Sequence, residues 1–109
     1  MDARQERRAR NESLFRDVNE RIAGVRQTLA VASDEGQFVC ECHELGCAAR
    51  FTCGLSEYEQ LRADPTTFAV VPGHEDPSVE NVLEERGEYT IVRKHPGEPA
   101  QRAAEDSPR

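Results

Sequence analysis

The segment Cys40-Glu41-Cys42-His43-Glu44-Leu45-Gly46-Cys47 places three thiols around one tight loop. Thiolates combined with imidazole are the ligands that favour tetrahedral zinc. Cys40 and Cys42 are closer in sequence than the cysteines of a common zinc knuckle. Alternate residues of an extended segment nevertheless share one face, with Cα atoms about 6.6 Å apart. We therefore expect a zinc site at these thiols; the alternative is a cluster of reduced thiols that binds no metal.

Three side chains are candidates for the fourth ligand, namely His43, Cys53 and His74. His74 follows Val71-Pro72-Gly73, a sequence that favours a type II turn and would hold the histidine rigidly beside the cysteine loop. His74 is therefore the favoured ligand. Cys53 alternates with Phe51 along a strand-like segment, which is more typical of a thiol in the core. His43 lies inside the loop and could reach the ion only by straining it, so both residues remain alternatives.

The segments around the loop predict a compact series of short elements. Gln37–Glu41 and Arg50–Gly54 are the two strands of an expected hairpin. Ser56-Glu57-Tyr58-Glu59 has the pattern of a capping box, so a short helix should follow and end before Asp64-Pro65. The β-branched and aromatic segment Thr66–Val71 favours a third strand.

A second short helix is expected after Asp76-Pro77, since Asp is a good N-cap and Pro is tolerated at the first helical position. Its inner face would carry apolar residues at i, i+3 and i+4 spacing: Val79, Val82 and Leu83. Gly87 would end this helix, and Glu88–Arg93 would form the last strand. Residues 94–109 are polar, so we expect a disordered tail there.

The start of the chain, residues 1–33, predicts an amphipathic helix. Its apolar positions recur at spacings of three and four: Phe15, Val18, Ile22, Val25 and Leu29. The basic residues 4–10 supply no apolar anchor, so we expect fraying before Asn11 and an end at Ser33-Asp34-Glu35-Gly36. The repeat covers fewer than three heptads, which favours packing on the rest of the chain. The alternative is pairing with a protein partner, or as a homodimer, through the same stripe.

These elements together predict an α+β fold: a long N-terminal helix, a small zinc-stapled domain over residues 37–93, and a tail over residues 94–109. The middle segment has about 57 residues. A hydrophobic core of that size supplies only about 3 to 5 kcal/mol, so a metal cross-link would help it fold.

Composition narrows the class of protein. The chain has 109 residues, of which 37% are hydrophobic and 32% charged, with a net charge of -7. Its longest apolar runs are far below the ~18 residues of a membrane span, and its polar beginning is unlike a signal peptide. We expect a cytoplasmic protein, whose thiols in a reducing compartment are metal ligands or reactive groups rather than disulfides.

Charge and motifs argue against two functional classes. Residues 1–32 hold seven Arg against five acids, whereas residues 33–109 hold seven basic residues against sixteen acids. The acidic part would repel a phosphate backbone, so nucleic acid is an unfavoured partner. The chain contains no phosphate-binding loop, dinucleotide fingerprint or nucleophile elbow, and we expect no enzymatic activity.

The favoured function is a regulatory or protein-interaction module with a structural zinc site. A thiol-based redox switch is the first alternative, in which oxidation of the zinc thiolates releases the metal. A nucleic-acid-associated zinc protein is the second.

The order of motifs resembles a group of small uncharacterised actinobacterial proteins. The matching segments run from about Asn11 to Val92 and are Asn11–Ile22, Phe38–Cys42 with Cys47, Glu57-Tyr58 and Val71–Glu75. The resemblance implies a cytosolic zinc-binding-like protein without a settled activity. It also implies the ligand set Cys40, Cys42, Cys47 and His74, because the position of Cys53 is usually aliphatic in that group. The presence of both His43 and Cys53 departs from the pattern.

Overall fold

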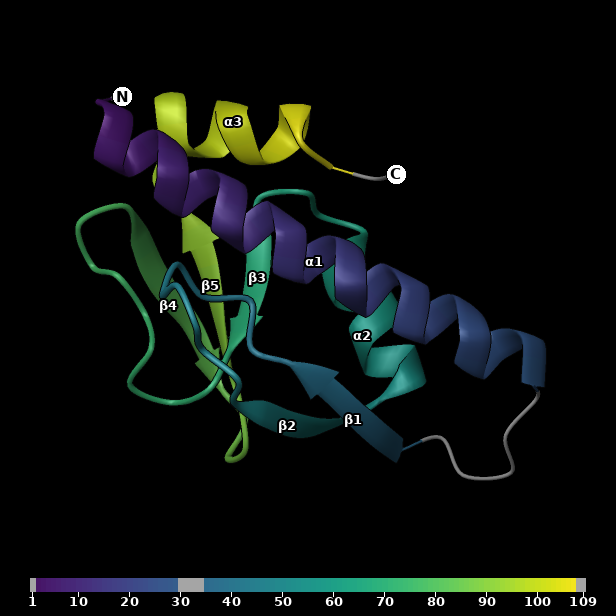
Figure 1. Cartoon of the computed structure of the whole chain (residues 1–109). Coiled ribbons are helices and arrows are strands. Elements are labelled where there is room, and N and C mark those ends of the chain that lie inside the picture. Colours follow the sequence, from purple (N-terminus) through teal and green to yellow (C-terminus); the bar gives the residue numbers. More distant parts are fainter. Residues whose placement is uncertain (1, 30–34, 108–109) are drawn as a thin grey trace.

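The computed structural model describes residues 2–29 and 35–107 and shows an α+β fold (Figure 1). The elements in chain order are α1 (Ala3–Leu29), β1 (Glu35–Val39), β2 (Arg50–Gly54), α2 (Leu55–Arg62), β3 (Thr67–Val70), β4 (Glu80–Glu85), β5 (Thr90–Lys94) and α3 (Glu98–Glu105). Helix α1 runs along the molecule, with α3 beside its first half and α2 beneath its second half. None of the described helices is long and apolar enough to cross a membrane.

The strands form two antiparallel sheets. The predicted hairpin is confirmed: β1 pairs with β2 in a register that places Phe38 opposite Phe51. The second sheet has the order β3-β5-β4, and Val92 in its central strand lies opposite both Phe68 and Val82. Strand β3 brings the Pro-Gly turn and His74 to the end of the hairpin that carries the cysteines.

The expected second short helix is wrong, because β4 occupies most of its length. Asp76 does begin a turn, and its carbonyl accepts from the backbone N–H groups of Val79 and Glu80. The chain then forms an edge strand that pairs with β5 from Glu80 to Glu85, with an irregularity between Val82 and Glu84. Val82 and Leu83 remain 44% and 47% exposed, so these two residues contribute little to the core.

The expected disordered tail is also wrong, because α3 lies within residues 94–109. Ala103 is buried, and its carbonyl accepts a hydrogen bond from the Arg16 guanidinium of α1. Arg102 adds ion pairs to Glu6 and Asp106. The tail is therefore held by polar contacts with α1, which a count of apolar residues does not reveal.

The sequence patterns predict the wrong starting residue for two helices, α1 and α2. Helix α1 begins at Ala3 instead of fraying up to Asn11, because Asp2 and Gln5 cap each other's backbone N–H groups. Helix α2 begins at Leu55, so Ser56 lies inside its first turn and is not the N-cap. The predicted end of the first helix falls partly on residues 30–34, outside the described residues.

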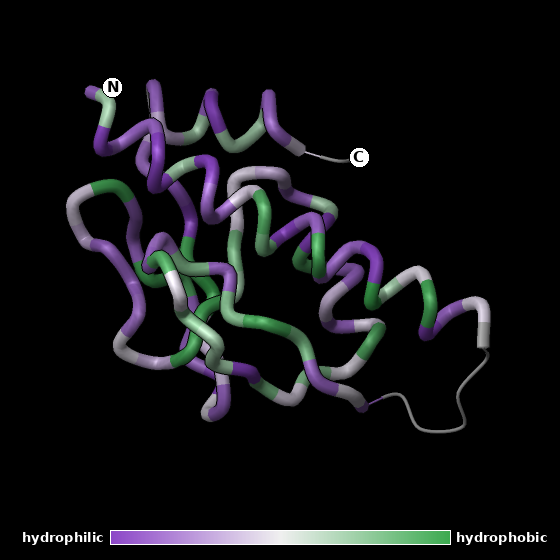
Figure 2. The backbone as a smooth tube through the Cα atoms, viewed as in Figure 1, coloured by the Kyte–Doolittle hydropathy of each residue, from purple (hydrophilic) through white to green (hydrophobic). Residues whose placement is uncertain are grey.

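Helix α1 buries a polar side. Its buried residues are Asn11, Glu12, Arg16, Asn19 and Ala23. In the predicted apolar stripe, Ile22 packs against the core and Phe15 and Val18 are half-buried, while Val25 is 57% exposed. Figure 2 shows hydrophilic residues along most of this helix. The stripe therefore lies beside the docked face and only partly on it.

Two groups of apolar side chains form the core. One contains the stacked rings of Phe38 and Tyr58, together with Phe51 and Tyr89. The other surrounds Phe68 and Val92 and includes the cysteines of the Cys-x-Cys pair. The thiols are thus placed at the edge of the core, where they are shielded from water.

Candidate metal centre

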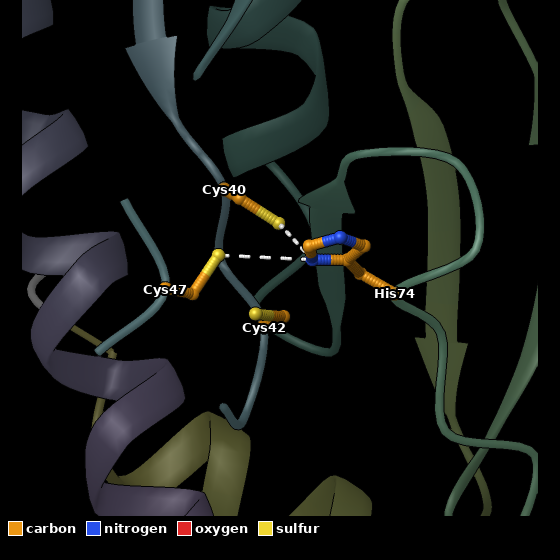
Figure 3. Close-up of side chains that lie close together, drawn as sticks. All are labelled: Cys40, Cys42, Cys47 and His74. Atoms are coloured by element: carbon orange, nitrogen blue, oxygen red, sulfur yellow. Dashed lines mark hydrogen bonds between the residues drawn. The ribbon is translucent and has the colours of Figure 1, made fainter. Parts of the chain in front are cut away.

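Four predicted ligands converge at one point. The sulfur atoms of Cys40, Cys42 and Cys47 and a ring nitrogen of His74 all lie within 4.8 Å of one another (Figure 3). The Nδ1 atom of His74 is 3.6 Å from the Cys40 sulfur and 3.7 Å from the Cys47 sulfur. A tetrahedral zinc ion with ordinary bond lengths separates its sulfur and nitrogen ligands by about 3.6 Å. The two distances from His74 match this separation, and the four ligand atoms together lie close enough to bind a metal ion.

Local backbone structure explains how each ligand reaches the centre. Cys40 and Cys42 directly follow β1 and share one face of an extended segment. Gly46 has a positive φ of 81° and turns the chain so that Cys47 returns to them. Gly73 has a φ of 91°, and the backbone N–H of His74 donates to the carbonyl of Val71. The turn predicted for the Pro-Gly sequence is the feature that presents His74.

The backbone N–H of Val71 donates a hydrogen bond to the Cys40 sulfur at 3.1 Å. The backbone at Glu44 acts to lower the pKa of Cys42, and the backbone at Ala49 acts to lower that of Cys47. Backbone N–H donors of this kind stabilise a thiolate relative to a thiol.

The thiols also interact with one another. A hydrogen bond from Cys40 lowers the pKa of Cys42 to about 5, and the same contact, together with burial, raises the pKa of Cys40. Burial raises the pKa of Cys47 as well. The Cys42 thiolate therefore forms readily, and binding of a metal ion would release the protons of the other two thiols.

The structure leaves the two alternative ligands outside the group. Cys53 is buried in the hydrophobic core, and its thiol donates to the carbonyl of Gly54. The ring of His43 lies near carboxylates, with Nδ1 3.9 Å from Asp76 and Nε2 3.7 Å from Glu44. Among the described residues, the cysteine loop and His74 form the group that could hold a metal ion.

The sequence patterns missed Glu41, which anchors the Cys-x-Cys pair to the core. Its carboxylate is fully buried and accepts hydrogen bonds from the Asn19 amide at 2.8 Å, the Tyr58 hydroxyl at 2.7 Å and the Ala69 N–H at 2.9 Å. Arg62 lies 3.7 Å away. The alternation of side chains along an extended segment could have predicted this. If Cys40 and Cys42 both face the metal, Glu41 between them must face the opposite side.

Two asparagines of α1 hold the metal loop from the other side. The Asn11 amide donates to the carbonyls of Cys42 and Glu44, at 3.2 and 3.1 Å. Asn19 forms a reciprocal pair with the backbone of Val39, at 2.7 and 2.8 Å. The polar side of α1 is thus part of the support of the metal centre.

Comparisons of the chain with protein families, curated proteins and solved structures give no match. The resemblance to small actinobacterial proteins therefore stays a prediction.

Proposed function

We propose that this protein is a non-enzymatic protein-interaction module with a structural zinc ion bound by Cys40, Cys42, Cys47 and His74. The observation that carries the proposal is the convergence of these four ligand atoms within 4.8 Å. Three thiolates and one imidazole are a donor set typical of structural zinc. A cation there would cross-link the segment after β1 to the turn after β3.

Coordination number supports a structural role. Four protein ligands complete a tetrahedral sphere, whereas catalytic zinc usually has three protein ligands and a water molecule. Cys40 and Cys42 are each only 1% exposed, so the centre lies mostly inside the protein. Reduced thiols of this kind are expected in the cytoplasm, where we propose that the protein works.

The proposed interaction surface is the apolar flank of α1, formed by Leu14, Val18 and Val25. Leu14 and Val25 are 58% and 57% exposed, while the polar side of the helix is occupied by the metal loop and α3. Exposed apolar residues at helical spacing favour pairing with a second helix. We propose an apolar helix of a partner protein, or of a second copy of this chain, as the occupant.

The metal can be tested by native mass spectrometry of the reduced, untagged protein. The wild-type chain should carry the added mass of one zinc ion, and Cys42→Ser should lose it. Cys53→Ser is the matched control, because its thiol lies in the core, and this variant should keep the metal. A bare wild-type chain, or equal metal loss in both variants, would contradict the zinc proposal.

The interaction surface needs a separate test. Val25→Glu should abolish a dimer detected by light scattering, or binding of a partner, while leaving the zinc content unchanged. Gln27→Glu, on an exposed part of the same helix, is the control for added charge. Unchanged association in Val25→Glu would remove this surface from the proposal without affecting the metal centre.

A redox switch is the second candidate, because the ligands differ in exposure. Cys47 is partly exposed and lines an open groove with His74, whereas the other two thiols are buried. Hydrogen peroxide would oxidise the Cys47 thiolate to a sulfenic acid and release hydroxide. Condensation with a neighbouring thiol would then form a disulfide, release water and remove two zinc ligands. Zinc released in proportion to peroxide would support this candidate, and retained zinc would leave a structural site only.

A further inference from the structure

A second site lies away from the metal, in a cavity of ≈ 290 Å³ between the first half of α1, α3 and the three-stranded sheet. None of the four metal ligands lines it. Its apolar surface comes from residues of four parts of the chain: Ala9, Phe68, Val79, and Pro99 with Ala103. Ligand pockets in proteins begin at about 300 Å³, so this α1–α3 cavity has room for one ring and a small head group.

The charges around the α1–α3 cavity differ from those of the whole chain. The lining holds four cationic side chains and three acidic ones: Arg4, Arg8, Lys94 and Arg102 against Asp2, Glu12 and Asp76. The protein as a whole has a net charge of -7. The lining therefore has one more cationic than acidic side chain, and cationic groups that are not already paired would favour an anionic ligand.

The cationic side chains of the lining differ in whether they already form ion pairs within the protein. Lys94 donates to both Glu12 and Glu80 and is buried, so it serves the fold. Arg8 lies 3.3 Å from Asp76 but keeps a partly exposed side chain. Arg4, within residues 2–29 and 35–107, takes part in no ion pair, so its guanidinium is free to bind a ligand.

The arginines also line the approach to the cavity. Arg4 and Arg8 border a neighbouring open groove together with Arg7, His43 and Glu44. An anion arriving from this side meets guanidinium groups before it reaches the apolar floor. At the inner end, burial raises the pKa of Glu12 to about 7, which reduces the negative charge there at neutral pH.

We propose that the α1–α3 cavity binds a small organic anion with a flat apolar body. The body would pack against the partly buried Ala9, Val79 and Pro99, and its carboxylate or phosphate would accept hydrogen bonds from Arg4 and Arg8. The planar guanidinium group donates two parallel hydrogen bonds to either head group. This site is independent of the zinc proposal, because the metal ligands do not line it.

The test uses the full chain, labelled with ¹⁵N, and follows amide chemical shifts during titration with phenyl phosphate or benzoate. Saturable shifts should cluster at Ala9, Ser13, Val79 and Ala103. The probe that binds with the higher affinity shows whether the cavity prefers a phosphate or a carboxylate head group. Benzyl alcohol, which has the ring without the charge, should bind at least about 10-fold more weakly, as expected for loss of a charged hydrogen bond.

Variants of the arginines separate the cavity from general surface charge. Arg4→Gln should weaken the better probe by about 10-fold, for the same reason. Arg7→Gln is the matched control, because Arg7 lines the outer groove and not the cavity, and it should leave the affinity nearly unchanged. Equal losses in both variants would show nonspecific attraction and overturn the proposal.

Filling the cavity gives a further independent result. Ala9→Phe should keep a native-like spectrum and abolish binding, because the new ring would occupy the apolar space. Binding that survives this variant would overturn the proposal. So would equal affinity for benzyl alcohol, or no saturable shift with either anion at about 10 mM, ten times a millimolar Kd.

Discussion

The docked side of α1 carries Asn11, Glu12, Arg16 and Asn19, whereas its neighbouring flank carries Leu14 and Val25. The polar side is buried and the apolar flank is exposed, which reverses the usual arrangement of a helix on a domain. Each of these polar residues has a partner of matching chemistry on the metal loop, on α3 or on the sheet. Burial of polar groups is tolerated when hydrogen bonds replace the lost water.

The two sides of α1 therefore differ in what they specify. The polar side fixes where α1 docks, because a hydrogen-bonded network is satisfied in one position only. The apolar flank has no such requirement, and its Leu14 and Val25 are exposed. Substitutions on the polar side should therefore affect stability, and those on the flank should affect association.

The largest expected effect is at Arg16, which is fully buried. Its guanidinium donates to the carbonyls of Pro65 and Ala103, both at 2.8 Å, and lies over the Phe68 ring. Arg16→Met would leave two carbonyls without these donors and should lower the free energy of unfolding by about 3 kcal/mol. Urea denaturation measures this change. Arg21→Met, at an exposed position, should change it by less than about 0.5 kcal/mol.

Substitution of Asn19 should have the next largest effect on stability, and it also tests whether α1 supports the metal centre. Asn19→Leu removes hydrogen bonds to Val39 and to the buried Glu41, which should cost about 2 kcal/mol. Zinc should also be lost to a competing chelator at a lower chelator concentration. Gln27→Leu, on the exposed part of α1, is the control. Equal zinc retention in the two variants would mean that α1 does not support the metal centre.

The buried carboxyl group of Glu12, beside Lys94, predicts that stability depends on pH. Burial raises the pKa of Glu12 from 4.5 to about 7, so the folded chain holds this proton more tightly than the unfolded chain. The free energy of unfolding should therefore fall as pH rises from 4.5 to about 7, by at most about 1.4 kcal/mol per pH unit.

Substitution isolates this contribution from that of other titrating groups. Glu12→Gln should show a smaller decline in urea stability over the same pH range, because Gln does not titrate. Glu88→Gln, at an exposed site, should keep the wild-type slope. An identical slope in wild type and Glu12→Gln would show that this carboxyl group does not titrate in that range.

The smallest effect on stability is expected on the flank. Leu14→Gln and Val25→Ser replace side chains that are more than half exposed, so each should change the free energy of unfolding by less than about 0.5 kcal/mol. Thermal or urea unfolding of a dilute sample measures this. A loss of about 2 kcal/mol in either variant would place the flank inside the folded core and break the comparison.

Local patterns found much of the candidate site. The Cys-x-Cys pair, the loop to Cys47 and the Pro-Gly turn before His74 act over a few residues, so their sequence contains most of the required geometry. The same reasoning failed at β4 and α3, where the partner is remote in sequence. Val82 became part of a strand because β5 lies beside it, and α3 is held by Arg16.

Sequence alone determined the α+β class, the hairpin and the three thiols of the metal loop, and it favoured His74 over Cys53 and His43, because hydrophobic alternation and turn chemistry are local properties. Tertiary structure decided which side of α1 is buried and what Glu41 contacts. It also decided that the last residues fold back as α3. These outcomes depend on hydrogen bonds between residues far apart in the chain, such as Asn19 with Glu41 and Arg16 with Ala103. A buried charge is stable only when a partner group lies beside it, and the position of that partner depends on the whole fold.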